Sequence, residues 1–442
     1  MSYSHSHCPA RSLALIICER SVGSIRRPRA EWGGCVLNAP IALLRFAAEM
    51  KLVVLLLVLI ASGACDRPAP PAPIEADESG SRPRLGLWVL AQGSHRTLED
   101  PAKVTRLVAD AISLGATDLF VQVYRAGRSW YPSRQADDTP YARTQTATGP
   151  AGLRRLIDAA HAEGLQVHAW FNALSLHRNR EAPLLASLGP AAVLVDRKGR
   201  NLLDYPDFEV PQPDRRHTRM GTPGIFLDPA AEGVIDYLVA SVAELVAAAP
   251  DLDGLHLDFI RHPLALPIVP GSRFDGLDFG YGKHAVAAFE AARGRRFARG
   301  SDWDDFRRER VHDLVKALHA EIPESWAYSA AVLPWADRAY QSAMQDWRRW
   351  LEEGSLDFAV AMLYTRDDRL LRYVADSLVG GTSGERVWLG LGSWLFLDDA
   401  PRMQHQLDLA AARAPAGVAL FSYDSLADKP GALAALHWPS NP

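Results

Sequence analysis

The residues best placed to do chemistry occupy positions 252–263, where two carboxylates, an arginine and two histidines follow one another closely. The apolar residues predict a short strand over 254–259, and side chains alternate along a strand, so His256 and Asp258 share one face. A carboxylate at the end of an apolar strand, followed by Arg261, suits a core poorly unless that end opens into a cavity. We therefore predict that Asp258 is a catalytic carboxylate, kept ionised by Arg261 and His256. The alternative is a buried Asp that pairs with Arg261 or caps the next element.

Strand-like and helix-like segments alternate through most of the remaining chain. Short apolar runs predict eight strands, and apolar residues at three- and four-residue spacing predict the helices between them. The predicted strands cover residues 85–90, 118–124, 166–172, 254–259, 327–333, 358–364, 387–391 and 418–423. The predicted helices include residues 101–114, 152–163, 231–248, 302–320, 341–353, 367–378 and 402–412.

This alternation indicates an α/β protein in which residues 84–442 form a (β/α)8 TIM barrel. The predicted strands are short, apolar and not cleanly alternating, as a parallel sheet buried on both sides requires. A doubly wound open sheet is the second possibility, but no glycine-rich phosphate turn supports it. The connections over 173–230 and 260–300, after the third and fourth strands, are too long for simple loops. We expect them to build walls of a site at the carboxyl ends of the strands.

Polar and aromatic residues gather at the predicted strand ends. Any one of them is most often a packing residue or a helix cap, but seven of the eight ends carry such residues. Tryptophan and tyrosine stack well on the flat apolar faces of sugars, so the set indicates a carbohydrate-type site. The predicted substrate-binding residues are Gln122, Tyr124, His168, Trp170, Asn172, His256, Trp335, Tyr364, Trp394 and Tyr423. Asn172 is expected to bind a sugar hydroxyl.

Composition sets wider limits on the class of protein. The chain has 442 residues, 48% of them hydrophobic, and a formal net charge of -4 at pH 7, which gives no support to nucleic-acid binding. All four cysteines, Cys8, Cys18, Cys35 and Cys65, lie near the amino terminus. We therefore expect no disulfide, thiolate metal site or cysteine nucleophile in the globular part.

A secretory signal is predicted over residues 50–64, where a basic start precedes nine apolar residues and a group of small ones. The small residues directly before Cys65 resemble the lipobox of bacterial lipoproteins, which implies cleavage and lipidation at Cys65. Residues 65–83 are then a Pro/Ala-rich tether, and residues 1–49 are interpreted as an upstream extension of the gene. Asp66 favours retention at the inner membrane, with the protein facing the periplasm.

Several segments resemble the glycosyl hydrolase-like 10 family of bacterial envelope proteins, over roughly residues 84–425. They read LWV at 87–89, FVQVY at 120–124, VHAWFN at 167–172, FLDP at 226–229 and DGLHLDFIRHP at 253–263. The resemblance implies a TIM-barrel glycoside hydrolase of the cell envelope that acts on a polysaccharide, such as the glycan strands of peptidoglycan; family members are often lipoproteins, in keeping with the lipobox at Cys65. It implies no cofactor. By its fourth-strand position, Asp258 also resembles the nucleophile of α-amylase-type barrels.

The sequence departs from this expectation in its second carboxyl group. Glycoside hydrolysis normally uses two, yet the predicted fifth and sixth strands contain none. The acid must then come from a loop, and Asp424 is favoured for its position at a strand end. The other candidates are Asp204, Asp207, Glu209, Asp337, Asp367 and Asp368.

Two other classes of function remain open. One is a non-catalytic, glycan-binding barrel that kept the aromatic residues and lost the acid. The other is a metal-dependent hydrolase that uses His168, His256 and Asp258. Residues 84–442 contain no His-x-His or His-Glu-x-x-His signature to support the second, so no metal is expected.

Overall fold

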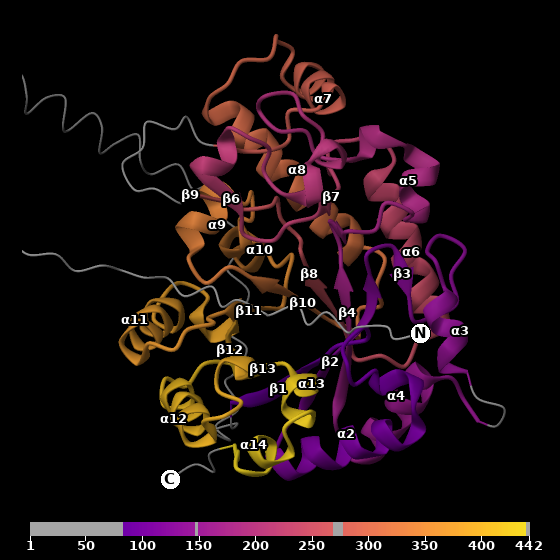
Figure 1. Cartoon of the computed structure of the whole chain (residues 1–442), viewed down its shortest axis with the longest axis vertical. Helices are drawn as coiled ribbons and strands as arrows, with labels where there is room; N and C mark the ends of the chain where they lie inside the picture. The colour runs from indigo at the N-terminus through magenta and orange to yellow at the C-terminus, as the bar shows by residue number, and fades with distance from the viewer. Residues whose placement is uncertain (1–82, 146–148, 268–276, 439–442) are drawn as a thin grey trace, which may run out of the picture. The chain divides into compact units, whose positions relative to one another are not determined.

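Eight parallel strands close into a barrel in the computed structural model, which describes residues 83–145, 149–267 and 277–438 (Figure 1). Each strand pairs with the next along the chain, and the first also pairs with the last, which closes the sheet. The strands are β1 (Arg84–Val89), β2 (Asp118–Arg125), β4 (Gln166–Asn172), β8 (Gly254–Asp258), β10 (Ala327–Val332), β11 (Phe358–Met362), β12 (Val387–Gly392) and β13 (Gly417–Phe421). The predicted TIM barrel is confirmed, within a compact unit that spans Ser79–Pro442.

The interior of the barrel is filled by aromatic side chains rather than left open. Trp88, Phe120, Trp170 and Trp388 pack together inside the sheet and are almost completely buried. Glycines on neighbouring strands leave room for these rings, because a Cβ on Gly417 would lie only 2.4 Å from a ring atom of Trp388. The barrel is therefore a packed core that supports a site at one end.

Helices surround the barrel and bury one apolar side each. In α2 (Pro101–Leu114), Asp100 caps the first turn by accepting from the Ala102 amide, and Gly115 ends the helix with φ +83°. The other helices between strands are α4 (Gly152–Ala162), α6 (Val234–Ala248), α8 (Ser301–His319), α11 (Asp368–Val379) and α12 (Ala400–Ala411). Shorter elements are β3 (Arg128–Ser129), α3 (Thr139–Thr144), α13 (Tyr423–Ala427) and α14 (Pro430–Ala434).

The helix predicted over 341–353 is wrong, since two short helices replace it. They are α9 (Ala336–Ser342) and α10 (Trp347–Glu352), and Met344 between them has φ +55°, which a continuous helix does not tolerate. The break has a structural use, because the buried side chain of Gln345 accepts a 2.9 Å hydrogen bond from the Leu333 amide. It thereby satisfies a backbone donor just past the end of β10.

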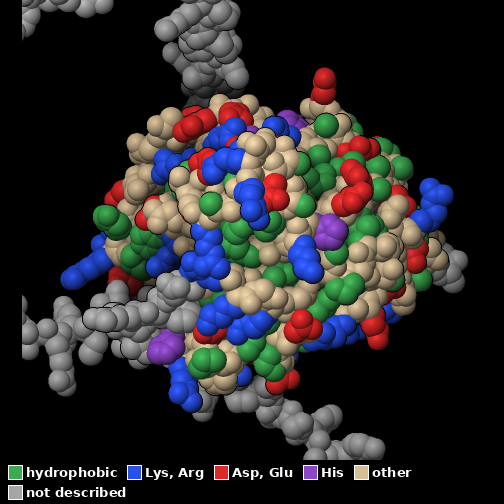
Figure 2. All heavy atoms as spheres, turned by 90° about the horizontal axis from the view of Figure 1, so that it is seen from above, with side chains coloured by type: hydrophobic (Ala, Val, Ile, Leu, Met, Phe, Trp, Pro, Cys, Tyr) green, Lys and Arg blue, Asp and Glu red, His purple; other side chains and the backbone are tan. Residues whose placement is uncertain are grey.

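The two long connections fold over the carboxyl ends of the strands, as predicted. The first contains β5 (Ser175–His177), α5 (Pro183–Leu188), β6 (Thr218–Met220) and β7 (Ile225–Phe226), and the second contains β9 (Ala265–Pro267) and α7 (Lys283–Arg293). Strand β6 of the first pairs antiparallel with β9 of the second. In Figure 1 both lie above the barrel, and Figure 2 shows the molecule from that side.

The expectations for residues 1–82, including the lipidation of Cys65, lie outside the described residues. None of the helices in the described ranges combines the length and apolar character that a membrane crossing requires.

Candidate active site

Asp258 is the last residue of β8 and lies at the carboxyl end of the barrel. Its side chain is 7% exposed. Trp170 Nε1 donates to Oδ2 at 3.2 Å, and the amide of Phe259 donates to Oδ1 at 2.6 Å. Two hydrogen bonds from neutral donors thus fix the orientation of a nearly enclosed carboxyl group.

Two arginines act on Asp258 by charge without a direct salt bridge to it in the described structure. They are Arg261 and Arg125, the latter at the end of β2. Arg261 is buried, and its guanidinium lies 5.1 Å from the centre of the Phe259 ring. Burial raises the pKa of the Asp258 carboxyl, and the Arg261 charge, the two hydrogen bonds and the Arg125 charge offset this only in part. Asp258 therefore holds its proton more tightly than an ordinary aspartate.

The prediction that His256 supports Asp258 is wrong. His256 Nε2 accepts a 3.1 Å hydrogen bond from Trp88 Nε1, which leaves the proton on Nδ1 to be donated to Ser329 Oγ at 2.9 Å. Burial, followed by the charge of His168, lowers the pKa of His256 well below its usual value. The ring is thus a neutral packing residue inside the barrel, two residues below Asp258 on the same strand face.

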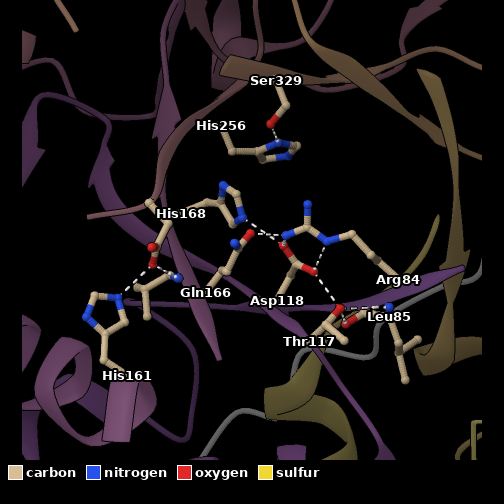
Figure 3. A network of polar contacts seen from close by, with 11 residues as sticks. Arg84, Leu85, Thr117, Asp118, His161, Gln166, His168, His256 and Ser329 are labelled. Atoms are coloured by element: carbon tan, nitrogen blue, oxygen red, sulfur yellow. Dashed lines mark hydrogen bonds and ion pairs between the residues drawn. The ribbon is translucent and has the colours of Figure 1, made fainter. Parts of the chain in front are cut away.

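His168 also lies away from the predicted site, in a network at the amino-terminal ends of the strands (Figure 3). Its Nε2 lies 2.8 Å from Asp118 Oδ1, and Asp118 also accepts from Arg84 Nε at 2.9 Å. Arg84 also donates to Gln166, and Arg84, Asp118 and Gln166 are the first residues of β1, β2 and β4. Because the strands are parallel, this network occupies the end of the barrel opposite Asp258, where a structural role is expected.

Three of the predicted substrate-binding residues do lie beside Asp258 at the carboxyl end of the barrel, namely Gln122, Trp170 and Asn172. Asn172 is the register partner of Asp258 on the neighbouring strand, and its Oδ1 accepts a 3.3 Å hydrogen bond from Gln122 Nε2. Asn172 Nδ2 lies 3.4 Å from Nε2 of His177, which follows in β5. These contacts create a polar rim beside the carboxyl group.

Tyr124 and Tyr423 point out of the barrel, so their predicted substrate contacts are wrong. The register between β2 and β4 shifts between Gln122 and Tyr124, which turns Tyr124 outward, where it stacks on Phe171 at 4.1 Å between ring centres. The hydroxyl of Tyr423 donates to Asp110 on α2 at 2.9 Å. Both rings belong to the layer between sheet and helices.

Of the remaining predicted aromatic residues, Tyr364 lies among the rings next to Asp258, while Trp335 and Trp394 keep partly exposed faces. Tyr364 stacks on Phe421 at 5.7 Å, and Phe421 lies edge-on to Trp170 at 6.0 Å. Burial, followed by the Asp258 charge, raises the pKa of Tyr364 well above its usual value. Trp394 is 43% exposed, and Trp335 is half-buried.

Asp424 turns away from Asp258 and fastens the loop that follows β1. Its Oδ2 accepts a 2.7 Å hydrogen bond from the Leu90 amide, while the buried Oδ1 has no partner in the described structure. Burial raises the pKa of Asp424 to about 6, with the charge of Asp428 as a smaller contribution. The charged groups that act on it are Asp428 and Lys103 rather than Asp258.

Replacing Asp424 with Asn should stabilise the fold at neutral pH. The raised pKa means that the folded state binds this proton more tightly than the unfolded chain, so wild-type stability is lost as the pH rises from about 4 to about 6. Asn keeps an acceptor for Leu90 and avoids this loss, which amounts to up to about 3 kcal/mol. Urea unfolding should show a higher free energy of unfolding for Asp424→Asn than for the wild type at pH 7.5, but not at pH 4. An equal gain at both would contradict the assignment.

The other candidate acids have structural partners or lie on the surface. Asp367 caps α11 by accepting from the amides of Arg369 and Leu370, and Asp368 forms a 2.7 Å salt bridge with Arg402. The candidates exposed on the surface are Asp204, Asp207 and Asp337, while Glu209 is half-exposed. The described structure thus brings none of the predicted acids into contact with Asp258.

A cavity of about 390 Å³ opens beside this site. It is bordered by Arg125 and Arg128 from β2 and β3, by His177 from β5, and by the residues that follow His177. Burial, followed by the charge of Arg125, lowers the pKa of His177 to about 4, so this ring is neutral at pH 7. No sequence pattern singled out His177, whereas Arg125 directly follows the predicted second strand, where a residue of the site is expected.

Metal ligands do not gather at this site. Within the described ranges, no three His, Cys, Asp or Glu side chains lie close enough together to hold a metal ion. His168 and His256 have the protein partners described above rather than a shared position with Asp258.

A family model for glycosyl hydrolase-like 10 proteins matches residues 84–370, which carry most of the barrel and the Asp258 site. The chain belongs to this family. Two relatives are each 25% identical to the chain: the glycosyl hydrolase DigH of Escherichia coli and the glycosyl hydrolase YngK of Bacillus subtilis. The match covers 89% of this chain and 95% of DigH, but 60% of this chain and 49% of YngK.

A solved structure supports the fold of this glycosyl hydrolase-like 10 protein. The PgaB (BpsB) glycoside hydrolase domain of Bordetella bronchiseptica superimposes with a TM-score of 0.57 at 14% identity, covering 81% of this chain and all of that domain. The family and the shared barrel together support a glycosidase role.

Proposed function

We propose that this protein is a glycoside hydrolase of the bacterial cell envelope that acts on the glycan strands of peptidoglycan, with Asp258 as a catalytic carboxylate. The observation that carries the proposal is the environment of Asp258. The carboxyl group lies at the carboxyl end of a barrel strand, fixed by Trp170 and the Phe259 amide. This end of the barrel is where TIM-barrel enzymes place their chemistry.

The surrounding residues have complementary roles in this proposal. The charges of Arg261 and Arg125 stabilise the ionised form of Asp258, against the burial that favours the protonated form. A carboxyl group balanced in this way can exchange a proton or carry charge during cleavage of a glycosidic bond. Asn172 and Gln122 supply hydrogen bonds for sugar hydroxyls. Tyr364, Trp335 and Trp394 supply stacking surfaces.

The envelope location rests on the amino-terminal sequence. Lipidation at Cys65 would anchor the protein, and the tether over 65–83 would hold the barrel away from the membrane on the periplasmic side. Asp66 supports retention at the inner membrane. Metabolic labelling with a fatty-acid analogue tests this, because replacing Cys65 with Ala should abolish the label and release the protein from membranes.

A product assay tests the activity directly. The purified protein is incubated with peptidoglycan that retains its stem peptides and with strands from which an amidase has removed them, and soluble fragments are separated and weighed. Release of short glycans or muropeptides with new reducing ends supports a glycosidase. Binding to both forms without any new reducing ends would instead establish the alternative function, a glycan-binding barrel.

One observation favours that alternative. Asp424, the favoured second carboxyl group, turns toward Leu90 instead of Asp258. A barrel with one carboxyl group and a set of aromatic platforms would bind glycans without cleaving them. Under this alternative, replacing Asp258 with Asn leaves glycan affinity largely intact.

Replacing Trp394 with Ala should weaken glycan binding with little effect on turnover. Trp394 is the most exposed of the proposed platforms, and loss of one stacking face costs a bound sugar about 1 kcal/mol. We expect KM to rise about fivefold while kcat changes less than twofold. Tyr373 on α11 is 70% exposed and provides the control, because its replacement with Ala should leave KM unchanged. If both substitutions changed KM equally, Trp394 would not be a sugar-stacking residue of the site.

A further inference from the structure

The cavity beside Asp258 is strongly basic. Four arginines border it, namely Arg125, Arg128, Arg178 and Arg180, and Glu181 is the one acidic residue that lines it within the described structure. The surface above the barrel carries basic and acidic side chains side by side (Figure 2). The excess of positive charge is therefore a property of this cavity rather than of the whole face.

The arginines differ in how far the protein itself occupies them. Arg128 forms a 3.2 Å salt bridge with Asp137, and Arg180 donates to the carbonyl of Leu203 at 2.8 Å. Among the described residues, the side chain of Arg178 has no hydrogen bond or salt bridge, and its guanidinium lies 5.5 Å from the centre of the Phe208 ring in a cation–π contact.

Arg125 is the least satisfied member of the group. It is half-buried, and its side chain forms no hydrogen bond or salt bridge with another described residue. Burial lowers its pKa, which the charge of Asp258 opposes. A partly desolvated guanidinium without a direct protein partner favours an anionic ligand, because its N–H donors have no acceptor from the described residues.

Neutral sugars do not need such a cavity. Neutral hydroxyls are bound well by amides and aromatic faces, both of which the site already has at Asn172 and Tyr364. Clustered guanidinium groups match the geometry and charge of carboxylate, sulfate or phosphate groups. His177 is neutral at pH 7, so it can accept or donate one hydrogen bond without adding to the charge.

We propose that this cavity is a subsite for an anionic substituent on the glycan, held by Arg125 and Arg178 next to the glycosidic bond whose cleavage Asp258 would catalyse. The inference rests on the proposed function and names the substrate class for the same site. It places a negatively charged sugar in the cavity and an uncharged sugar over the aromatic residues.

The test uses one polysaccharide in two chemical forms. Peptidoglycan strands freed of stem peptides carry sugar carboxylates, which carbodiimide activation and borohydride reduction convert to alcohols without breaking the chain. We expect kcat/KM on the carboxylated strands to exceed that on the reduced strands by about tenfold to a hundredfold, the value of a charge-assisted hydrogen-bond pair. Raising the salt concentration should narrow this ratio. Sulfated chito-oligosaccharides form a third arm, and a preference for them would identify the anion as sulfate.

Variants assign the preference to the cavity. Arg178→Gln should lower the ratio of kcat/KM on carboxylated strands to kcat/KM on reduced strands at least fivefold, mainly by raising KM for the carboxylated strands. Arg125→Gln provides a second measurement in case Arg178→Gln folds poorly. Arg134→Gln is the control, because its side chain is 97% exposed and lies against Glu244 on α6. The proposed subsite would be rejected if the wild type had nearly equal kcat/KM on carboxylated and reduced strands. It would also be rejected if both cavity variants kept the wild-type ratio of these values.

The carboxylated and reduced glycan strands also distinguish a failure of this inference from a failure of the proposed function. If the wild type cleaves neither form, the hydrolase is refuted, and the dissociation constants of the two forms are compared by calorimetry. A tighter complex with the charged form still supports the anionic subsite, whereas equal affinities reject it.

Discussion

Asp258→Asn should reduce the cleavage of glycan strands by about a thousandfold while making the protein more stable at neutral pH. The loss of activity follows from removing the one carboxyl group that the site positions with two hydrogen bonds. The gain in stability follows from burial, which raises the pKa of Asp258. The folded state then binds its proton more tightly than the unfolded chain, so wild-type stability falls as the pH rises through this pKa. Asn has no charge to bury and does not show this fall.

Two measurements check this prediction together. Initial rates of reducing-end release give the catalytic effect, and thermal unfolding at pH 5 and pH 8 gives the stability. Asp376→Asn is a suitable control, since that carboxylate lies on the surface of α11 and pairs with Arg413. Undiminished activity in Asp258→Asn would show that another group carries the chemistry. A lower melting temperature at pH 8 would show that the arginine charges outweigh burial.

Asp118→Ala should destabilise the barrel by about 3 kcal/mol without acting on the Asp258 site directly. Asp118 is fully buried at the amino-terminal end of the barrel and accepts from Arg84, His168 and Thr117. Its removal leaves an arginine and a histidine without their shared acceptor. Asp158→Ala removes the carboxylate of an exposed pair with Arg154 and should destabilise the protein far less than Asp118→Ala does.

The pH dependence provides a second check on Asp118. Burial alone would raise its pKa, but the hydrogen bond and charge of His168 and the charge of Arg84 lower it overall. A lowered pKa contributes stability above the ordinary value of 3.8, and this contribution disappears as the pH falls through the folded-state pKa. The difference between wild type and Asp118→Asn in urea unfolding should therefore shrink below about pH 4. A difference that stays constant down to pH 2.5 would contradict the assigned network.

The sequence predicted the barrel because each strand is an apolar run of the right length and each helix has a clear apolar side. It also predicted the position of Asp258, since parallel strands must bring their carboxyl ends together. It misplaced side chains wherever a local irregularity changes the alternation. The shift after Gln122 turns Tyr124 outward, and no residue type near it signals that shift.

Depth inside the barrel was equally hard to predict. His168 and His256 do share faces with Asn172 and Asp258, as period-two alternation requires. They lie too low to reach the site, because large rings such as Trp88 and Phe120 fill the space around them. Alternation fixes which way a side chain points, whereas the packing of neighbours decides whether it reaches solvent.

The pairing of β6 with β9 has a consequence for how this protein can vary. Three residues of the first long connection form a ladder with three residues of the second, so neither excursion has an independent structure at that point. A deletion in one would leave unpaired backbone groups in the other. The two connections therefore form one structural unit. To change substrate choice by replacing these connections with those of a related barrel, both must be replaced together.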